Sequence, residues 1–260
     1  MSNIIHISPK EKKYKHPILL VHGALFNGKI WEGNFLEYFP QLGYETYSIT
    51  LSGHGVEASK LMLNFYGIND FVDDVIQLIT QLEEKPILIG YSMGGIISQI
   101  VAQQISLEKV ILLASVPPYG MLSSSFKYWA KSPISWGKFM VSTVFPILKY
   151  VDTDAPEGIY YTPPSKKLQY FIGQNMQSES LRALLELIIK DFEIDPLKST
   201  VPMLHIGFKS DQIIFPEEVE RTASFYGHES KIFEKMAHMF MYEPHWKQVG
   251  DYIQGWLNKS

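Results

Sequence analysis

Predicted strands alternate with predicted amphipathic helices along the first half of this chain, and this alternation restricts the fold more than any other feature of the sequence. The strands are mostly short apolar runs, which are typical of strands covered on both faces. They lie at residues 18–21, 44–51, 86–90 and 109–114, and the helical segments between them lie at 30–39, 70–84 and 93–105. Such a β-α-β order predicts a mostly parallel sheet flanked by helices.

The alternation stops after Val116 and resumes at Val201. Between these points we find helical segments, including a strongly amphipathic one at 181–192, and no convincing strand. After them come the predicted elements of the second half, namely a strand at 201–207, a helix that starts at Pro216, a strand at 230–233 and a helix at 246–257. We therefore expect one α/β core domain made of residues 1–116 and 199–260, interrupted by a helical cap at 117–198.

A G-x-S-x-G motif, Gly90-Tyr91-Ser92-Met93-Gly94, joins the third predicted strand to the helix after it. In that position the motif is typical of a nucleophile elbow, a sharp turn that keeps a serine hydroxyl exposed. The two glycines leave room for the strand and the helix to approach each other. The alternative is a glycine-rich turn that only packs. We interpret Ser92 as the candidate nucleophile.

A serine hydroxyl is a weak nucleophile at neutral pH, so it needs a base, and the base needs an orienting carboxylate. Asp211 lies just beyond the predicted strand at 201–207, at the sheet edge where Ser92 also emerges. Asp195 precedes that strand and therefore belongs to the opposite edge, while Asp191 falls within the helical region. The sequence predicts Asp211 as the acid.

Eight histidines compete for the role of base. His238 lies between the last predicted strand and the closing helix, in a loop at the carboxyl edge of the sheet, where sites in open α/β sheets form. His205 lies inside a strand and His245 at the start of the last helix, so we expect neither to be the base. His22 and His54 each follow a strand, and we expect structural roles for them.

With these motifs the sequence resembles the α/β-hydrolase superfamily, in its serine esterase and lipase branch with a helical cap. The resemblance rests on His22-Gly23, Ser52-Gly53-His54-Gly55, Gly90 to Gly95, Gly207 to Asp211 and Ala237-His238, in the family's order of serine, acid and histidine. It implies an eight-stranded sheet with the cap inserted after the sixth strand. It also implies an oxyanion hole made of the backbone N–H groups of Ala24 and Met93. Thr50 departs from the family, in which many members carry an aspartate there.

The predicted cap is rich in aromatic and methionine side chains. These side chains either form the packing of the cap itself or line an apolar pocket over Ser92. The candidate substrate-binding residues are Leu25 in the core and, in the cap, Tyr119, Trp129, Trp136, Phe139 and Met140. On this interpretation the cap sets substrate choice and leaves the catalytic groups untouched.

Charge and residue composition argue against several other kinds of function and site. The net charge is −4, and the one short basic run, at residues 10–15, predicts no nucleic-acid partner. With no cysteine, the chain has no disulfide, no thiolate metal site and no cysteine nucleophile. We expect no metal and no cofactor. We see no signal peptide and no apolar stretch long enough to span a membrane, and we expect a cytoplasmic protein. The sequence leaves the oligomeric state open.

The sequence therefore predicts a serine hydrolase that cleaves a carboxylic ester of a small apolar molecule through an acyl-serine intermediate. Two alternatives use the same three residues, namely hydrolysis of a C–C bond in a diketone and a cyanohydrin lyase reaction. Resemblance to the lyases is weakened because Met239 follows His238 where they carry a lysine. A third alternative is a small-ligand receptor with residual hydrolase activity, since a fold does not fix a function.

Overall fold

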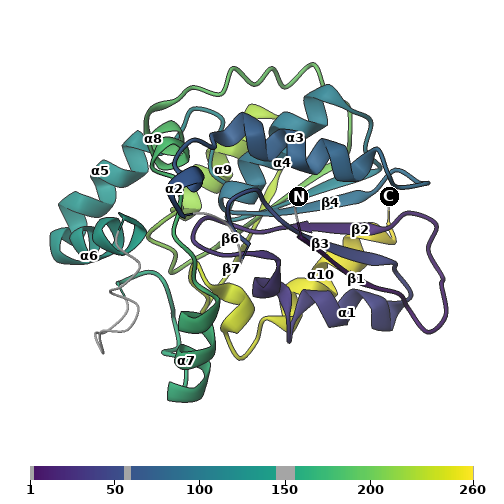
Figure 1. Ribbon diagram of the computed structural model, residues 1–260, viewed down its shortest axis with the longest axis horizontal. Coiled ribbons are helices and arrows are strands. Elements are labelled where there is room, and N and C mark those ends of the chain that lie inside the picture. The colour runs from purple at the N-terminus through teal and green to yellow at the C-terminus, as the bar shows by residue number, and fades with distance from the viewer. Residues whose placement is uncertain (1–2, 56–59, 145–155, 260) are drawn as a thin grey trace.

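Seven strands form a single sheet in the computed structural model, which describes residues 3–55, 60–144 and 156–259 (Figure 1). The strands are β1 (Asn3–Ile7), β2 (Ile18–Val21), β3 (Thr46–Thr50), β4 (Ile87–Tyr91), β5 (Lys109–Leu113), β6 (Met203–Phe208) and β7 (Ser230–Phe233). Their order across the sheet is β1-β3-β2-β4-β5-β6-β7. Only β1 runs antiparallel to its neighbour, and the other pairs are parallel.

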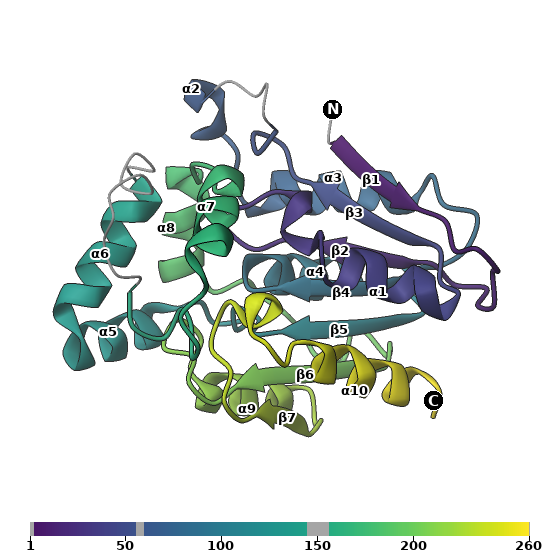
Figure 2. The same cartoon turned by 90° about the horizontal axis from the view of Figure 1, so that it is seen from below.

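Helices cover both faces of this sheet (Figures 1 and 2). One face carries α1 (Phe35–Leu42) and α10 (Lys247–Leu257), and the other carries α3 (Ile68–Ile79), α4 (Met93–Gln104) and α9 (Pro216–Phe225). Every residue of β2, β4, β5 and β6 is buried. The continuous apolar runs of the sequence thus become central strands, whereas β7 at the edge is only partly buried. The shorter elements are η1 (Gly28–Trp31), α2 (Lys60–Leu63) and η3 (Phe240–Tyr242).

The segment between β5 and β6, which we call the insertion (residues 117–198), contains four α-helices in its described part. They are α5 (Leu122–Lys131), α6 (Pro133–Val144), α7 (Lys166–Asn175) and α8 (Leu181–Ile189). The described part of the insertion, 117–144 and 156–198, contains no strand. The four helices gather at the carboxyl ends of the parallel strands, as Figure 2 shows.

Two details of the expected sheet are wrong for the described residues. The sheet has seven strands and not eight, and the insertion follows the fifth strand and not the sixth. The segment between β1 and β2 adds no strand. It contains Pro9, Pro17 and a run of charged residues, and proline cannot donate to a sheet ladder.

The predicted helix at 30–39 is divided into η1 and α1. Asn34 causes the break, because its side-chain oxygen accepts the backbone N–H of Phe35 at 2.6 Å and so caps a new helix. That helix ends at Gly43, whose φ of 109° lies in the left-handed region. Local capping therefore overrides a hydrophobic pattern that runs across both elements.

Candidate active site

Ser92 occupies the tight turn between β4 and α4. Its φ of 53° is one that residues with a side chain rarely adopt, and such strain costs about 1–3 kcal/mol. A Cβ atom at Gly90 would lie 2.2 Å from the carbonyl oxygen of Gly94, and one at Gly94 would lie 2.4 Å from that of Val21. Because only glycine fits at both positions, strand and helix close tightly around the turn and hold the serine at the sheet edge.

Asp211 and His238 lie in the loops that follow β6 and β7, beside Ser92. The distance from His238 Nδ1 to Asp211 Oδ2 is 2.7 Å, and the distance from His238 Nε2 to Ser92 Oγ is 3.1 Å. Because an ionised carboxylate only accepts hydrogen bonds, the imidazole proton lies on Nδ1 and Nε2 can accept the serine hydroxyl. All three residues are buried. The structure thus brings together the nucleophile, acid and base candidates of the sequence.

Backbone groups fix the acid and the base in this geometry. The second oxygen of Asp211 accepts the N–H groups of Ile213 and Ile214 at 2.8 and 2.9 Å. The backbone N–H of His238 donates to the carbonyl of Gly158 at 3.1 Å. With its carboxylate already oriented by two amides, Asp211 presents one oxygen to the imidazole.

The competing candidates do not reach Ser92. Asp191 and Asp195 each accept the backbone N–H of the residue two places further along their own loop. His205 Nε2 lies 3.2 Å from a nitrogen of His228, and burial, assisted by that neighbour, lowers the pKa of His205 to about 3. His245 is exposed on the surface. None of these side chains has a hydrogen bond to the serine or to His238.

The two amides expected to form the oxyanion hole have no protein acceptor among the residues that the structure describes. Ala24 follows β2, and Met93 is the first residue of α4, where the helix dipole favours negative charge. Within the described parts of the chain, neither backbone N–H donates to an oxygen of the protein. Ala24 also lines the same cavity as Ser92. Unoccupied donors beside a serine suit a tetrahedral oxyanion.

His22 is enclosed at the end of β2 and makes two backbone contacts. Its Nε2 accepts the N–H of Leu51 at 3.1 Å, so its Nδ1 carries the proton and donates to the carbonyl of Gly23 at 2.8 Å. Burial, and then the neighbouring His54, lower the pKa of His22 to about 3. His22 is therefore a neutral residue that fixes the turn after β2.

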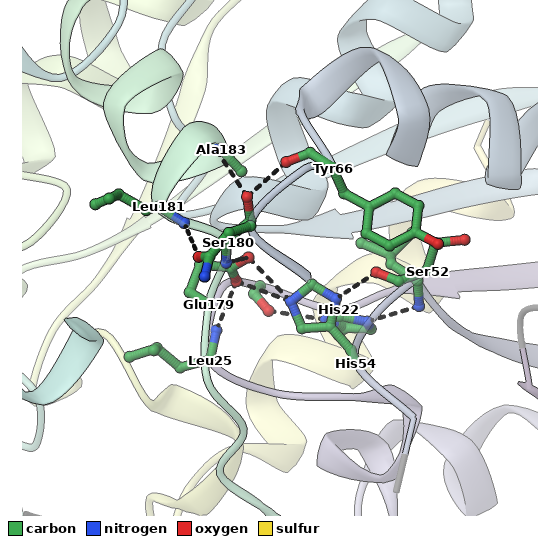
Figure 3. A network of polar contacts seen from close by, with 12 residues as sticks. His22, Leu25, Ser52, His54, Tyr66, Glu179, Ser180, Leu181 and Ala183 are labelled. Carbon is green, nitrogen blue, oxygen red and sulfur yellow. Dashed lines mark hydrogen bonds and ion pairs between the residues drawn. The ribbon is translucent and has the colours of Figure 1, made fainter. Parts of the chain in front are cut away.

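His54 pairs with Glu179, a residue that the sequence interpretation missed (Figure 3). His54 Nε2 lies 3.0 Å from both carboxylate oxygens, and both side chains are fully buried. Burial by itself favours the neutral imidazole, but Glu179 and the carbonyl of Ser52 favour the cation, and the pKa of His54 is raised. The Gly-His-Gly loop marked His54 in the sequence, but no local pattern pointed to a partner in the insertion.

The insertion also contacts the loop that carries Ala24. Glu179 accepts the backbone N–H of Leu25 at 3.0 Å, and the N–H of Gln177 donates to the Leu25 carbonyl at 2.6 Å. The sequence predicted that this segment sets substrate choice and leaves the catalytic groups untouched. The structure adds that it contacts Leu25, the residue next to a candidate oxyanion donor.

A cavity of about 1130 Å³ lies between the insertion and the carboxyl edge of the sheet. Ser92 and His238 open into it. Its wall is mostly apolar, and it includes four of the proposed substrate contacts, Leu25, Trp136, Phe139 and Met140. This mostly apolar space suits a substrate with an apolar group.

Tyr119 and Trp129 do not line this cavity, which corrects their expected role. The Tyr119 hydroxyl donates to Glu218 at 2.7 Å, so its ring packs toward α9. Trp129 is 48% exposed and lies against Phe126. On the same helix Tyr128 faces inward, and the next residue is rotated by about 100° in an α-helix of 3.6 residues per turn.

A metal site and a membrane span can be considered for the described residues. Among them, no group of three or more histidine, aspartate and glutamate side chains is arranged to hold a metal ion. In the same parts of the chain, no helix combines the length and the apolar character that crossing a membrane requires.

Comparison with known proteins agrees with this fold. A sequence model described as the alpha/beta hydrolase family matches residues 18–249. A protein of Synechocystis sp. that bears the name non-heme chloroperoxidase is 34% identical over 220 residues, which cover 76% of this chain and 75% of that protein. The pimeloyl-(acyl-carrier protein) methyl ester esterase of Aliivibrio salmonicida is 30% identical over 104 residues, 39% of this chain and 37% of that enzyme.

Among solved structures, an esterase from Exiguobacterium antarcticum superposes with a TM-score of 0.71 at 18% identity, covering 97% of this chain and 95% of the esterase. At this identity the likeness concerns the fold. The family match extends over most of the chain and includes β2, the turn at Ser92 and the loops that hold Asp211 and His238. This chain belongs to the alpha/beta hydrolase family.

Proposed function

We propose that this protein is a serine hydrolase that cleaves a carboxylic ester of a small, apolar substrate. The observation that carries the proposal is the hydrogen-bond chain from Asp211 through His238 to Ser92, which ends in an apolar cavity. Family membership supports hydrolysis as the type of reaction, and the relative named a methyl ester esterase supports an ester as the bond that is cleaved.

The first half of the reaction forms an acyl-serine. His238 Nε2 accepts the hydroxyl proton as Ser92 Oγ attacks the ester carbonyl, and Asp211 stabilises the resulting imidazolium. The tetrahedral intermediate collapses, the ester C–O bond breaks, and His238 returns the proton to the departing alcohol. The second half repeats these steps with water as the nucleophile, and it releases the carboxylic acid and free Ser92.

The negative oxygen of each tetrahedral intermediate would be held by the backbone N–H groups of Ala24 and Met93. Both amides lack a protein acceptor within the described residues, so no existing hydrogen bond has to break when the charge develops. One donor of this kind is worth about 10²–10³ in kcat in related enzymes.

We infer that the insertion (117–198) acts as a cap on a core made of residues 1–116 and 199–260. Side chains such as Trp136, Phe139 and Met140 would accept the apolar acyl group and exclude water. Water exclusion strengthens the polar contacts to the oxyanion. The candidate partner of this site is thus a small ester.

The test is turnover of p-nitrophenyl esters from acetate to laurate, combined with labelling by a fluorophosphonate. Sustained turnover by the wild type, with labelling that Ser92→Ala abolishes, is the expected result. One round of labelling without turnover of any ester would instead favour a small-ligand receptor. Ester turnover that persists in Ser92→Ala would remove this serine from the mechanism.

A further inference from the structure

The peptide group that presents the Ala24 N–H is oriented by a buried histidine. Gly23 and Ala24 share this peptide, and its carbonyl accepts a hydrogen bond of 2.8 Å from His22 Nδ1. In a trans peptide the carbonyl and the N–H point in opposite directions. Because His22 holds the carbonyl on one side, the Ala24 N–H points to the other.

The next peptide along the loop is held by the insertion. Leu25 has a φ of 69°, an unfavourable value for a residue with a branched side chain, so this conformation needs support from its surroundings. That support comes from both sides of the residue. Its N–H donates to Glu179 at 3.0 Å, and its carbonyl accepts the N–H of Gln177 at 2.6 Å.

The charge of Glu179 is matched by a buried partner. A carboxylate one residue from an oxyanion donor would repel the negative charge that develops during the reaction. His54 lies against both oxygens of Glu179 and is itself anchored by the Ser52 carbonyl (Figure 3). The other titratable groups around His54 are the neutral His22, whose ring centre lies 5.2 Å away, and Asp74, which accepts the N–H of Ser52. Glu179 can thus hold the loop without adding net negative charge.

We propose that Glu179 is a positioning residue, which fixes Leu25 and thereby the Ala24 N–H in the orientation that binds the oxyanion, with His54 as its counter-ion. The insertion would then complete the oxyanion hole in addition to shaping the cavity. The catalytic consequence rests on the function proposed above. The contact between Glu179 and Leu25 can be tested independently of it.

The catalytic test compares Glu179→Ala with a matched control, Glu186→Ala. Glu186 lies on α8 and accepts the backbone N–H of Ile68 at 2.7 Å, so it also joins the insertion to the core through a carboxylate and an amide, but away from Leu25. Loss of a positioned oxyanion donor should lower kcat with little change in KM. A displacement of about 1 Å can cost about 10²-fold, so we expect Glu179→Ala to lose about tenfold to hundredfold in kcat. Glu186→Ala should keep its kcat.

A conservative variant tests the reason for the loss. Glu179→Gln keeps an oxygen that accepts the Leu25 N–H and an amide that can face a neutral His54, so we expect it to retain most of the wild-type kcat. If Glu179→Ala does not fold, Glu179→Asp replaces it, because the shorter side chain withdraws its carboxylate from Leu25. The proposal is overturned if Glu179→Ala, or Glu179→Asp in its place, keeps the wild-type kcat or loses activity only through a higher KM. It is also overturned if Glu186→Ala loses as much kcat.

Amide hydrogen exchange gives a readout that needs no turnover. The segment at 23–28 should exchange faster in Glu179→Ala than in the wild type and in Glu186→Ala, because the Leu25 N–H loses its acceptor. Unchanged exchange there would contradict the positioning role, even in an active esterase. Absence of ester turnover and of Ser92 labelling in the wild type, with faster exchange in the variant, would contradict only the proposed reaction.

Discussion

Two buried histidine–carboxylate pairs lie near the carboxyl edge of the sheet, and they differ in what faces the second nitrogen of the imidazole. His238 uses Nδ1 for Asp211 and presents Nε2 to the hydroxyl of Ser92. His54 uses Nε2 for Glu179, and its Nδ1 faces the carbonyl of Ser52. The first pair can therefore pass a proton to and from a reacting group, whereas the second can only hold one.

The pairs also differ in the segments that they join. Asp211 and His238 both come from the core, in loops after the adjacent strands β6 and β7, although a backbone hydrogen bond to Gly158 of the insertion also holds His238. His54 comes from the core and Glu179 from the insertion, 125 residues later. On the two proposals above, the same two types of side chain form a proton-transfer pair in one place and a tether in the other. Access to the cavity distinguishes the two roles.

Removal of the Ser92 hydroxyl, which faces His238 of the first pair, should have the largest effect on activity. We expect Ser92→Ala to fold with an unchanged melting temperature and to lose roughly 10⁴-fold or more in kcat, as nucleophile deletions do elsewhere. Steady-state hydrolysis of a p-nitrophenyl ester measures the loss. Ser224→Ala, an exposed change on α9, should behave as the wild type. Retention of a tenth of the activity by Ser92→Ala would show that another residue attacks the ester.

The first pair should be nearly as sensitive to loss of its charge. Asp211→Asn preserves shape but favours the wrong tautomer of His238, and we expect a loss of about 10⁴-fold in kcat. Asp195→Asn and His245→Ala should keep substantial activity, because neither side chain contacts the serine. If Asp195→Asn proves as damaging while both variants stay folded, the assignment of the acid is wrong.

Side chains of the insertion that reach the cavity should have smaller and selective effects. We expect Trp136→Ala, Phe139→Ala and Met140→Ala each to change the discrimination between acyl chain lengths by about 1–3 kcal/mol. Trp129→Ala is the matched control, because that ring is exposed and lies away from the cavity. Profiles of kcat/KM against chain length check this. Unchanged profiles in the cavity variants would make those side chains packing residues only.

Two buried histidines should contribute to the pH dependence of stability in opposite directions, namely His205, which contacts His228, and His54, which pairs with a carboxylate. The pKa of His205 is lowered to about 3 by burial and by His228. The unfolded chain therefore binds a proton that the folded chain does not, and stability is lost as pH falls below about 6.5. The pKa of His54 is raised. Its contribution to stability is thus complete below about 6.5 and is lost as pH rises through the folded-state pKa.

Urea unfolding at a series of pH values measures both slopes. We expect His205→Gln to reduce the slope of the unfolding free energy against pH on the acid side by at most about 1.4 kcal/mol per pH unit. His54→Gln should reduce the slope on the alkaline side. This is the smallest of the expected effects. Changes of the same sign in the two variants would contradict the charge states that the structure indicates.

The sequence predicted the parts of the site that depend on short segments. The turn at Ser92 follows from glycines within two residues on either side, whose missing side chains let strand and helix meet. Asp211 and His238 could be located because each follows a strand, and parallel strands end at one edge. The number of strands at the β1 edge of the sheet was harder to predict, since the charged, proline-containing segment at 8–17 gave no clear pattern.

Helix orientation in the insertion could not be predicted from composition. Trp129 on α5 is as apolar as Trp136 and Phe139 on α6, but only the second two reach the cavity. On a short helix each residue is rotated by about 100° from the next, so the face that meets the core depends on how the helix docks.

The mostly parallel sheet, the serine turn and the approximate places of the acid and base candidates could be predicted from short segments, because sterics and burial act over a few residues. The contacts of Glu179 with His54 and Leu25 could be found only in the folded chain. No local pattern encodes the contact with His54, since its energy comes from two opposite charges that share a site sealed from water. Such a pair exists only after the insertion has packed onto the core.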